Sequence, residues 1–198
     1  MAVKLADWIC QYQQRDRKSY LKLVFYTEVW IINIAKLTIV FVISLLTGTI
    51  VYTIAALVGF NFLRRSAHGL HAKNGTVCTL GSIVLFVALP YILSVSGFTL
   101  GNYPVILIYG CIVSLLFLFA PADTESIPLV GRKKRAKLRR NAVISGAVMA
   151  AAVLLIPVEN LKIMLTLGSI YEVVSILPVS YKILGRQYRN YERYEQTA

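Results

Sequence analysis

The chain has 198 residues, of which 57% are hydrophobic and only 15% are charged, and its formal net charge is +12. Its mean hydropathy of +0.65 is too high for a water-soluble globular domain of this length. The composition therefore excludes soluble enzymes and soluble nucleic-acid-binding proteins and indicates a basic protein that resides in a lipid bilayer.

Residues 1–28 are predicted to form a cytoplasmic arm that contains an interfacial amphipathic helix. Leu5, Trp8, Ile9 and Tyr12 recur at helical spacing and would form one apolar stripe. An arm that packs on the protein itself explains the same pattern equally well. Charges occur throughout the arm and no compact apolar stretch precedes a small-residue cleavage site, so no cleavable signal peptide is predicted.

The rest of the chain is predicted to form six transmembrane helices, because a hydrocarbon core about 30 Å thick requires about 20 mainly apolar residues per helix. The expected spans are residues 29–46, 48–63, 78–96, 103–120, 142–158 and 161–184. Thr47-Gly48-Thr49 separates the first two, and its glycine favours a break over one long helix. Pro90 and Pro178 are expected to kink the third and sixth helices. The predicted fold is thus an all-α integral membrane protein with a single domain, 1–198.

The basic residues indicate how the helices are oriented. All 21 lysines and arginines except Lys36 and Lys162 lie in the terminal segments, in loops on the same side of the predicted membrane or, for Lys182, at the end of the sixth span next to the C-terminal segment. The positive-inside rule places these segments, and both termini, in the cytoplasm. Cys10 and Cys78 then face a reducing compartment, where a disulfide is not expected.

The densest positive charge falls in a predicted cytoplasmic loop at 121–141. The basic residues of this loop are Arg132, Lys133, Lys134, Arg135, Lys137, Arg139 and Arg140. Loops of this kind mostly rest on anionic lipid headgroups, where each basic residue gains about 1 kcal/mol. The alternative is that the loop attracts an acidic peptide segment.

Lys36 and Glu172 lie well inside predicted spans, where an unpaired charge costs about 3 kcal/mol. One interpretation is a structural ion pair that joins the first and sixth helices. The other is that both residues line a hydrated cavity. The second interpretation supports an alternative function, a small membrane exporter or channel that uses Lys36 and Glu172 as a polar pathway.

His71 and Cys78 carry the most chemical information, because a thiol and an imidazole held together form a cysteine nucleophile and its base. Uninterrupted helix between them would separate the two residues by about 10.5 Å, so the segment must turn. Asn74-Gly75 is a turn signal, and Thr76 is a candidate N-cap for the next helix. Cys78 would then lie in the first helical turn, where the helix dipole and the nearby Arg64, Arg65 and Lys73 favour a thiolate. Desolvation at the bilayer edge favours the neutral thiol, so the sequence does not give the direction of the net pKa shift.

His68 adds a third potential zinc ligand to His71 and Cys78. A structural zinc site would need a fourth ligand, and a catalytic zinc usually has a nearby carboxylate, which this segment lacks. No metal and no other cofactor is therefore predicted. The plainest alternative is a polar interfacial loop followed by an incidental buried cysteine.

The segment RRSAHGLHA at 64–72, followed by Cys78, resembles the accessory gene regulator B (AgrB) family of bacterial quorum-sensing peptidases. The resemblance continues through NIAK at 33–36, LP at 89–90, PA at 121–122 with Thr124, and Glu172 followed by LP at 177–178. The chain departs from the best-known members at Asp123 and Glu125, ahead of the basic residues.

The resemblance implies a cysteine endopeptidase of the bacterial cell membrane whose active site lies near the cytoplasmic face. Its partner would be a small AgrD-like propeptide, from which it removes the C-terminal tail and cyclises the remainder to a thiolactone or lactone signal. Cys78 is then the nucleophile and His71 the general base. Thioester exchange needs no ATP, and no G-x-x-x-x-G-K-[ST] phosphate-binding loop occurs.

Further residues are expected to support this site. The candidates to orient His71 are Asn74, Ser66, Glu172 and a backbone carbonyl. The candidates to stabilise the oxyanion are Arg64, Arg65 and backbone amides at the start of the third helix. Gly69 is expected to permit a close backbone approach. A homodimer is expected, because small helical membrane proteins commonly self-associate.

Overall fold

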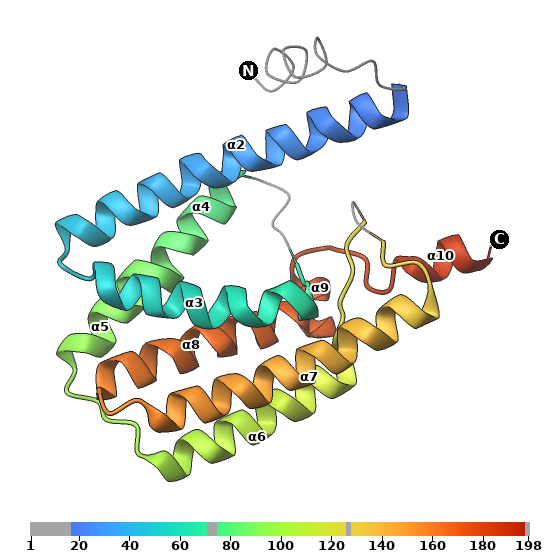
Figure 1. Cartoon of the computed structure of the whole chain (residues 1–198). Helices are drawn as coiled ribbons and strands as arrows, with labels where there is room; N and C mark the ends of the chain where they lie inside the picture. The colour runs from blue at the N-terminus through green and yellow to red at the C-terminus, as the bar shows by residue number, and fades with distance from the viewer. Residues whose placement is uncertain (1–16, 71–74, 126–127, 197–198) are drawn as a thin grey trace.

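The computed structural model describes residues 17–70, 75–125 and 128–196, and every regular element within these ranges is helical (Figure 1). The elements are α2 Arg17–Leu46, α3 Ile50–Ala67, α4 Gly75–Ile83, the π-helix η1 Val84–Ala88, α5 Leu89–Val95, α6 Asn102–Phe119, α7 Arg132–Leu155, α8 Glu159–Ile176, α9 Pro178–Ile183 and α10 Tyr191–Gln196. The predicted apolar stripe of the N-terminal arm lies outside the described residues. The expected all-α class is confirmed.

Among the described residues, four helical segments are long and apolar enough to cross a membrane: Thr27–Leu46, Gly75–Val95, Asn102–Phe119 and Arg132–Leu155. They correspond to the first, third, fourth and fifth predicted spans. The second and sixth correspond to α3 and α8, which are 18 residues each but more polar. The structure thus supports a helical membrane protein with four candidate spans, and the six-span topology with cytoplasmic termini stays a prediction.

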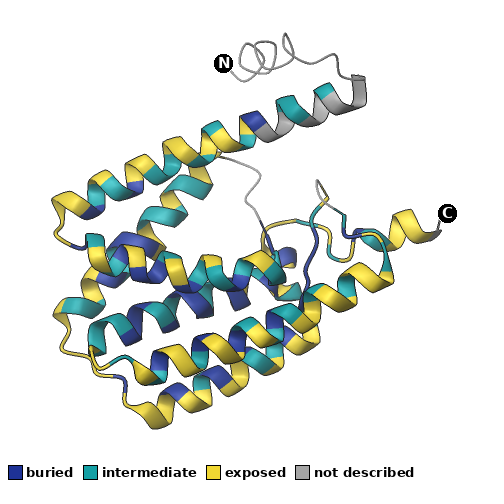
Figure 2. Ribbon diagram, in the orientation of Figure 1, coloured by how far each residue is buried: buried dark blue, intermediate teal, exposed yellow. Residues whose placement is uncertain are grey.

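The centre of the bundle is the contact between α3 and α8 (Figure 1). Two glycines make this contact close, because a Cβ atom at Gly59 would collide with the Leu165 carbonyl and one at Gly168 with the Ala56 carbonyl. Small residues at helix crossings let backbones touch and are typical of membrane bundles. Figure 2 shows that buried positions concentrate where α3 and α8 face their neighbours. Protein covers most of α8, which accommodates its polar residues, while α3 keeps an exposed apolar side at Val51, Ile54 and Val58.

The third span is interrupted by the π-helix η1, which directly precedes Pro90 in α5. In a regular α-helix the amide of residue 90 would donate to the Phe86 carbonyl, but proline has no N–H. The Thr53 hydroxyl on α3 donates to that carbonyl instead, at 2.6 Å. A neighbouring helix thereby satisfies a backbone group that water cannot reach in a membrane.

Other expected breaks are also present. The turn between α2 and α3 is centred on Gly48 at φ +70, as predicted. Pro178 separates α8 from α9, because Leu177 adopts an extended backbone ahead of it. One boundary differs from the prediction: α4 begins at Gly75, so Thr76 lies within the helix and does not cap it.

The second half of the predicted basic loop, 132–141, is helical, so α7 begins earlier than the predicted span 142–158. α7 begins at Arg132, so the positive cluster forms the first turns of a membrane helix. Lysine, arginine, alanine and leucine all have high helix propensity, and the run of such residues passes directly into the apolar part of α7. The positive charges therefore do not delay the start of α7 to residue 142, where the fifth span was predicted to begin.

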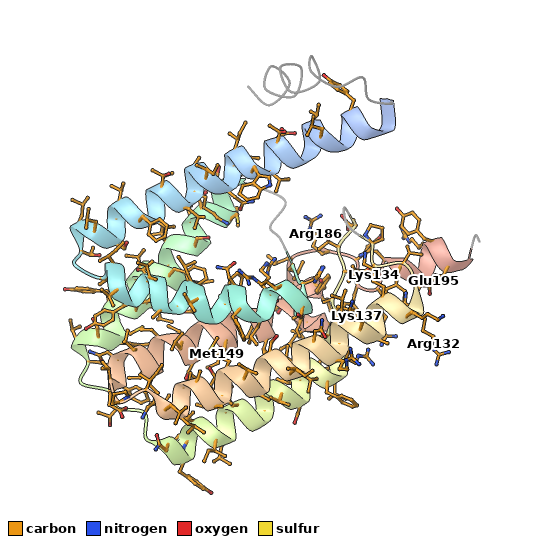
Figure 3. The ribbon with its side chains drawn as sticks, in the orientation of Figure 1. Arg132, Lys134, Lys137, Met149, Arg186 and Glu195 are labelled. Carbon is orange, nitrogen blue, oxygen red and sulfur yellow. The ribbon has the colours of Figure 1, made fainter. Side chains whose placement is uncertain are left out.

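The C-terminal segment folds back onto the start of α7 (Figure 3). The buried Asp123 carboxylate accepts hydrogen bonds from the backbone amides of Asn190 and Tyr191, at 3.0 and 2.8 Å. Arg135 binds Glu195 on α10 through both guanidinium nitrogens, at 2.6 and 3.0 Å. These contacts fix the C-terminal segment at the basic end of the bundle.

Candidate functional site

A cavity of about 690 Å³ opens between α2, α3, α4 with η1, and α8. Most of its wall is apolar and includes Leu37, Leu57, Phe60, Leu85 and Phe86. Polar groups reach it from the same helices, notably Lys36, Arg64 and Cys78. An apolar cavity with few polar groups is the usual form of a binding site for a small molecule or a peptide segment.

Cys78 lies in the first turn of α4, as predicted, and its half-buried thiol lines the cavity. The Lys36 ammonium on α2 donates to the Cys78 sulfur, with 3.8 Å between Nζ and Sγ. The sequence did not indicate this contact, because the two residues are 42 positions apart. The thiol is thus placed between a helix N-terminus and a cation.

His71 and Asn74 lie outside the described residues, so the expected contact between the His71 imidazole and the Cys78 thiol stays a prediction. The two ends of the intervening segment are described. Leu70 immediately precedes His71, and both Leu70 and Cys78 line the cavity. The described structure therefore stops at the cavity wall, and Val77 and Cys78, in the first turn after it resumes at Gly75, line the same wall.

Arg64 fixes the backbone that leads to His71. One of its guanidinium nitrogens donates to the Glu172 carboxylate on α8 at 2.9 Å. The other donates to the carbonyls of Gly69 and Leu70, at 3.3 and 2.8 Å. The Phe60 ring, 5.0 Å from the guanidinium carbon, provides a cation–π contact. Arg64 therefore acts on the site through the loop backbone, while the oxyanion role considered for it stays a prediction.

Glu172 and Lys36 do not pair with each other, so the predicted ion pair between the first and sixth helices is wrong. Glu172 is fully buried at 0% exposure, and one carboxylate oxygen accepts from Arg64 and from Ser175. The planar guanidinium of Arg64 suits this position, because one nitrogen binds the carboxylate while the other binds the two loop carbonyls. Lys36 lines the cavity and Glu172 is not among its lining residues, and the alternative of an exporter or channel stays a prediction.

Gly69 permits a close backbone approach, as expected. It adopts φ +128, and a Cβ atom there would collide with the Ser175 hydroxyl. Its amide donates to the Ala122 carbonyl at 3.1 Å, and the next amide, of Leu70, donates to the Ser175 carbonyl at 3.3 Å. The loop is thereby tied to both the α6–α7 connection and α8. Sequence reasoning missed Ser175, which has no local signature.

His68 and Arg65 do not line the cavity within the described residues. Burial lowers the pKa of the His68 imidazole, and the positive charges of Arg64 and Lys134 lower this pKa further. Its Nδ1 atom is buried without a partner in the described structure. Arg65 is exposed. Across the described ranges, no group of three or more His, Cys, Asp or Glu side chains is arranged to hold a metal ion.

The basic cluster at the start of α7 divides into two groups. Arg135 is bound to Glu195, and its guanidinium carbon lies 3.8 Å from the centre of the Tyr191 ring. Arg139 donates a hydrogen bond to the Ala120 carbonyl at 2.8 Å. Arg139 is nevertheless exposed, as are the remaining members Arg132, Lys133, Lys134, Lys137 and Arg140, and Figure 3 labels three of them, Arg132, Lys134 and Lys137. The exposed group is the part suited to lipid headgroups or an acidic peptide.

The family model described as accessory gene regulator B matches residues 2–176. The chain belongs to this family. Accessory gene regulator B proteins act in quorum sensing and take part in processing its propeptide. The four candidate membrane helices of this chain agree with the membrane location of the family. The AgrB-type assignment therefore gives the chain a place in an accessory gene regulator system.

Curated relatives agree with the AgrB family assignment. An AgrB-like protein of Clostridium acetobutylicum is 45% identical over 177 residues, which cover 89% of this chain and 84% of the relative. An AgrB-like protein of Listeria welshimeri is 42% identical, with 91% and 87% covered. The accessory gene regulator protein B of Staphylococcus haemolyticus is 30% identical, with 84% and 86% covered. No solved structure matches the chain.

Proposed function

We propose that this chain is a membrane cysteine endopeptidase that removes the C-terminal tail of an AgrD-like propeptide and cyclises the remainder to a thiolactone or lactone signal. The observation that carries the proposal is the position of Cys78, whose thiol lines a cavity of about 690 Å³ from the first turn of a membrane helix. The cavity offers the scissile segment an apolar wall that restricts water.

In the proposed reaction, His71 takes the proton of the Cys78 thiol, and the resulting thiolate attacks the scissile carbonyl carbon. The peptide C–N bond breaks as His71 gives the same proton to the leaving amine. This step releases the tail and leaves the propeptide attached to Cys78 as a thioester. A cysteine thiol or serine hydroxyl within the bound peptide then loses a proton to His71 and attacks the thioester carbonyl. The ring closes and the Cys78 thiolate is released.

Two surroundings of the cavity support this chemistry. Arg64 anchors the backbone of Gly69 and Leu70, so the loop that carries His71 starts from a fixed point beside the cavity. The exposed basic residues at the start of α7 lie at the same end of the bundle as the C-terminus of α3 (Figure 1). An acidic tail would be attracted to that end, and anionic lipid headgroups would be attracted there too. We place this end at the cytoplasmic face.

The test uses the full chain in membrane vesicles with a co-expressed AgrD-like propeptide, followed by mass spectrometry of the products. Cys78→Ala and His71→Ala should abolish tail removal while leaving membrane insertion unchanged. Cys111→Ala is the matched control, because Cys111 is exposed on α6 and does not line this cavity. A propeptide adduct on Cys78 that hydroxylamine releases would identify the thioester. Substantial cleavage by Cys78→Ala would refute the proposal.

A further inference from the structure

We infer that Lys36 is a further catalytic residue, whose ammonium group stabilises the Cys78 thiolate both as nucleophile and as leaving group. This inference rests on the proposed function, because it presupposes that Cys78 is the nucleophile. It assigns a chemical role to a charged residue that the hypotheses of an ion pair with Glu172 and of a polar pathway do not explain.

The geometry provides direct contact between the two groups. Lys36 Nζ lies 3.8 Å from Cys78 Sγ, which is within reach of a hydrogen bond to sulfur. The two side chains come from different helices, α2 and α4, and both line the cavity. A substrate carbonyl that approaches the sulfur from the cavity would therefore meet the cation beside it.

The charges around Lys36 point to sulfur as its intended partner. Within the described part of the chain, no carboxylate forms an ion pair with Lys36. Glu172, the acidic residue predicted to pair with it, is held by Arg64. A lysine inside a membrane helix requires an anion or water to offset its burial. Ionisation of Cys78 supplies that anion at the contact distance already present.

The apolar wall strengthens this effect. Leu37, Leu85 and Phe86 line the same cavity, so the ion pair would form in surroundings of low polarity, where charges attract more strongly than in water. The N-terminus of α4 acts on the sulfur in the same direction. Lys36 thus reinforces a preference that the helix position of Cys78 already creates.

The same contact serves both halves of the proposed reaction. In the first half the cation increases the share of Cys78 that is ionised and able to attack. In the second half the C–S bond of the thioester breaks as the ring closes, and the electron pair returns to sulfur beside the same ammonium. Lys36 therefore assists ring closure by stabilising the departing thiolate, while His71 carries the protons.

The first measurement is the rate at which iodoacetamide alkylates Cys78 in the purified full chain at pH 7, resolved by peptide mass spectrometry. Lys36→Met should lower this rate about tenfold or more, because fewer thiols are ionised. Lys36→Arg should retain most of it, since the positive charge remains. Cys111, exposed on α6, is alkylated in the same molecules and should keep its rate in every variant.

A control variant separates charge from packing. Thr38 lies on the same helix, α2, but is exposed and does not line the cavity; its hydroxyl donates to the Ile34 carbonyl. Thr38→Ala should leave Cys78 alkylation unchanged. The deficit of Lys36→Met should also close at high pH, where the thiol ionises without assistance. Propeptide cleavage should fall with Lys36→Met and recover with Lys36→Arg.

Two results would overturn the inference. The first is that iodoacetamide alkylates Cys78 in the Lys36→Met variant at the original rate, whether or not cleavage is lost. A residue that only supports packing would give this result. The second is that Cys78 in the Lys36→Arg variant is alkylated as slowly as in Lys36→Met. Either result contradicts the role of Lys36 alone, provided that Cys78→Ala does not cleave the propeptide. Cleavage by Cys78→Ala would instead contradict the proposed function, because Cys78 would not be the nucleophile.

Discussion

Replacing Arg64 by methionine should destabilise the protein through the loss of a buried ionic contact. The guanidinium is 15% exposed and its partner Glu172 is 0% exposed, so the carboxylate would be left in an apolar interior. Removing one member of a buried pair costs about 3–5 kcal/mol in soluble proteins. Polar contacts within membranes are weaker on average, so we take the lower end, about 3 kcal/mol.

For a chain of this size, about 3 kcal/mol corresponds to a fall in Tm of roughly 6–12 °C. The assay is thermal unfolding of the full chain in detergent. Arg65→Met is the matched control, because Arg65 lies in the same turn but is exposed, and it should change stability by no more than about 0.5 kcal/mol.

A double-mutant cycle tests whether the loss comes from Glu172. Arg64→Met combined with Glu172→Gln should recover part of the lost stability, because the second change removes the unpaired carboxylate. The coupling between the two positions should be on the order of 1 kcal/mol or more. A Tm for Arg64→Met that equals the Arg65→Met value, or additive effects in the cycle, would refute the reasoning.

Three further changes test other contacts. Thr53→Val should cost about 1 kcal/mol in thermal unfolding by leaving the Phe86 carbonyl unpaired, while Thr53→Ser should cost less; equal losses would contradict this role. Gly168→Ala should cost about 1–3 kcal/mol by forcing α8 away from α3, whereas Gly110→Ala, in open space, should not destabilise the chain. The hydrogen bond from Arg135 holds the pKa of the Glu195 carboxyl below its ordinary value of 4.5. The C-terminal segment should therefore stay docked above pH 4.5 and detach progressively as the pH falls below it. Amide hydrogen exchange in this segment that does not change over this range would contradict the contact.

Features that depend on neighbouring residues were predicted well from the sequence. The apolar runs located the long helices, the glycine between α2 and α3 marked a real break, and Cys78 falls in the first turn of its helix. Each of these depends on local hydrophobicity, backbone freedom or turn chemistry. The start of α7 was misplaced because a dense run of positive charge was taken as a loop, although its residues favour helix.

Features that depend on how helices rotate against one another were not predictable. Lys36 and Glu172 were paired because both are charged and lie in predicted spans. Which residues meet across helices depends on the direction each side chain faces, and a single sequence does not reveal that direction. The contact of Lys36 with Cys78, and that of Arg64 with Glu172, come from this tertiary arrangement. For the same reason, the sequence does not predict that α3 and α8 lie at the centre of the bundle.

The glycine crossing of α3 and α8 also has a mechanical consequence. Where two backbones touch, the helices have a fulcrum, and Glu172 lies only one turn, about 6 Å, beyond Gly168. A tilt of about 5° around that fulcrum would shift the carboxylate by only about 0.5 Å. Membranes of different thickness are accommodated mainly by helix tilt. The anchorage ahead of His71 should therefore stay nearly stationary when the lipid composition of the cell changes.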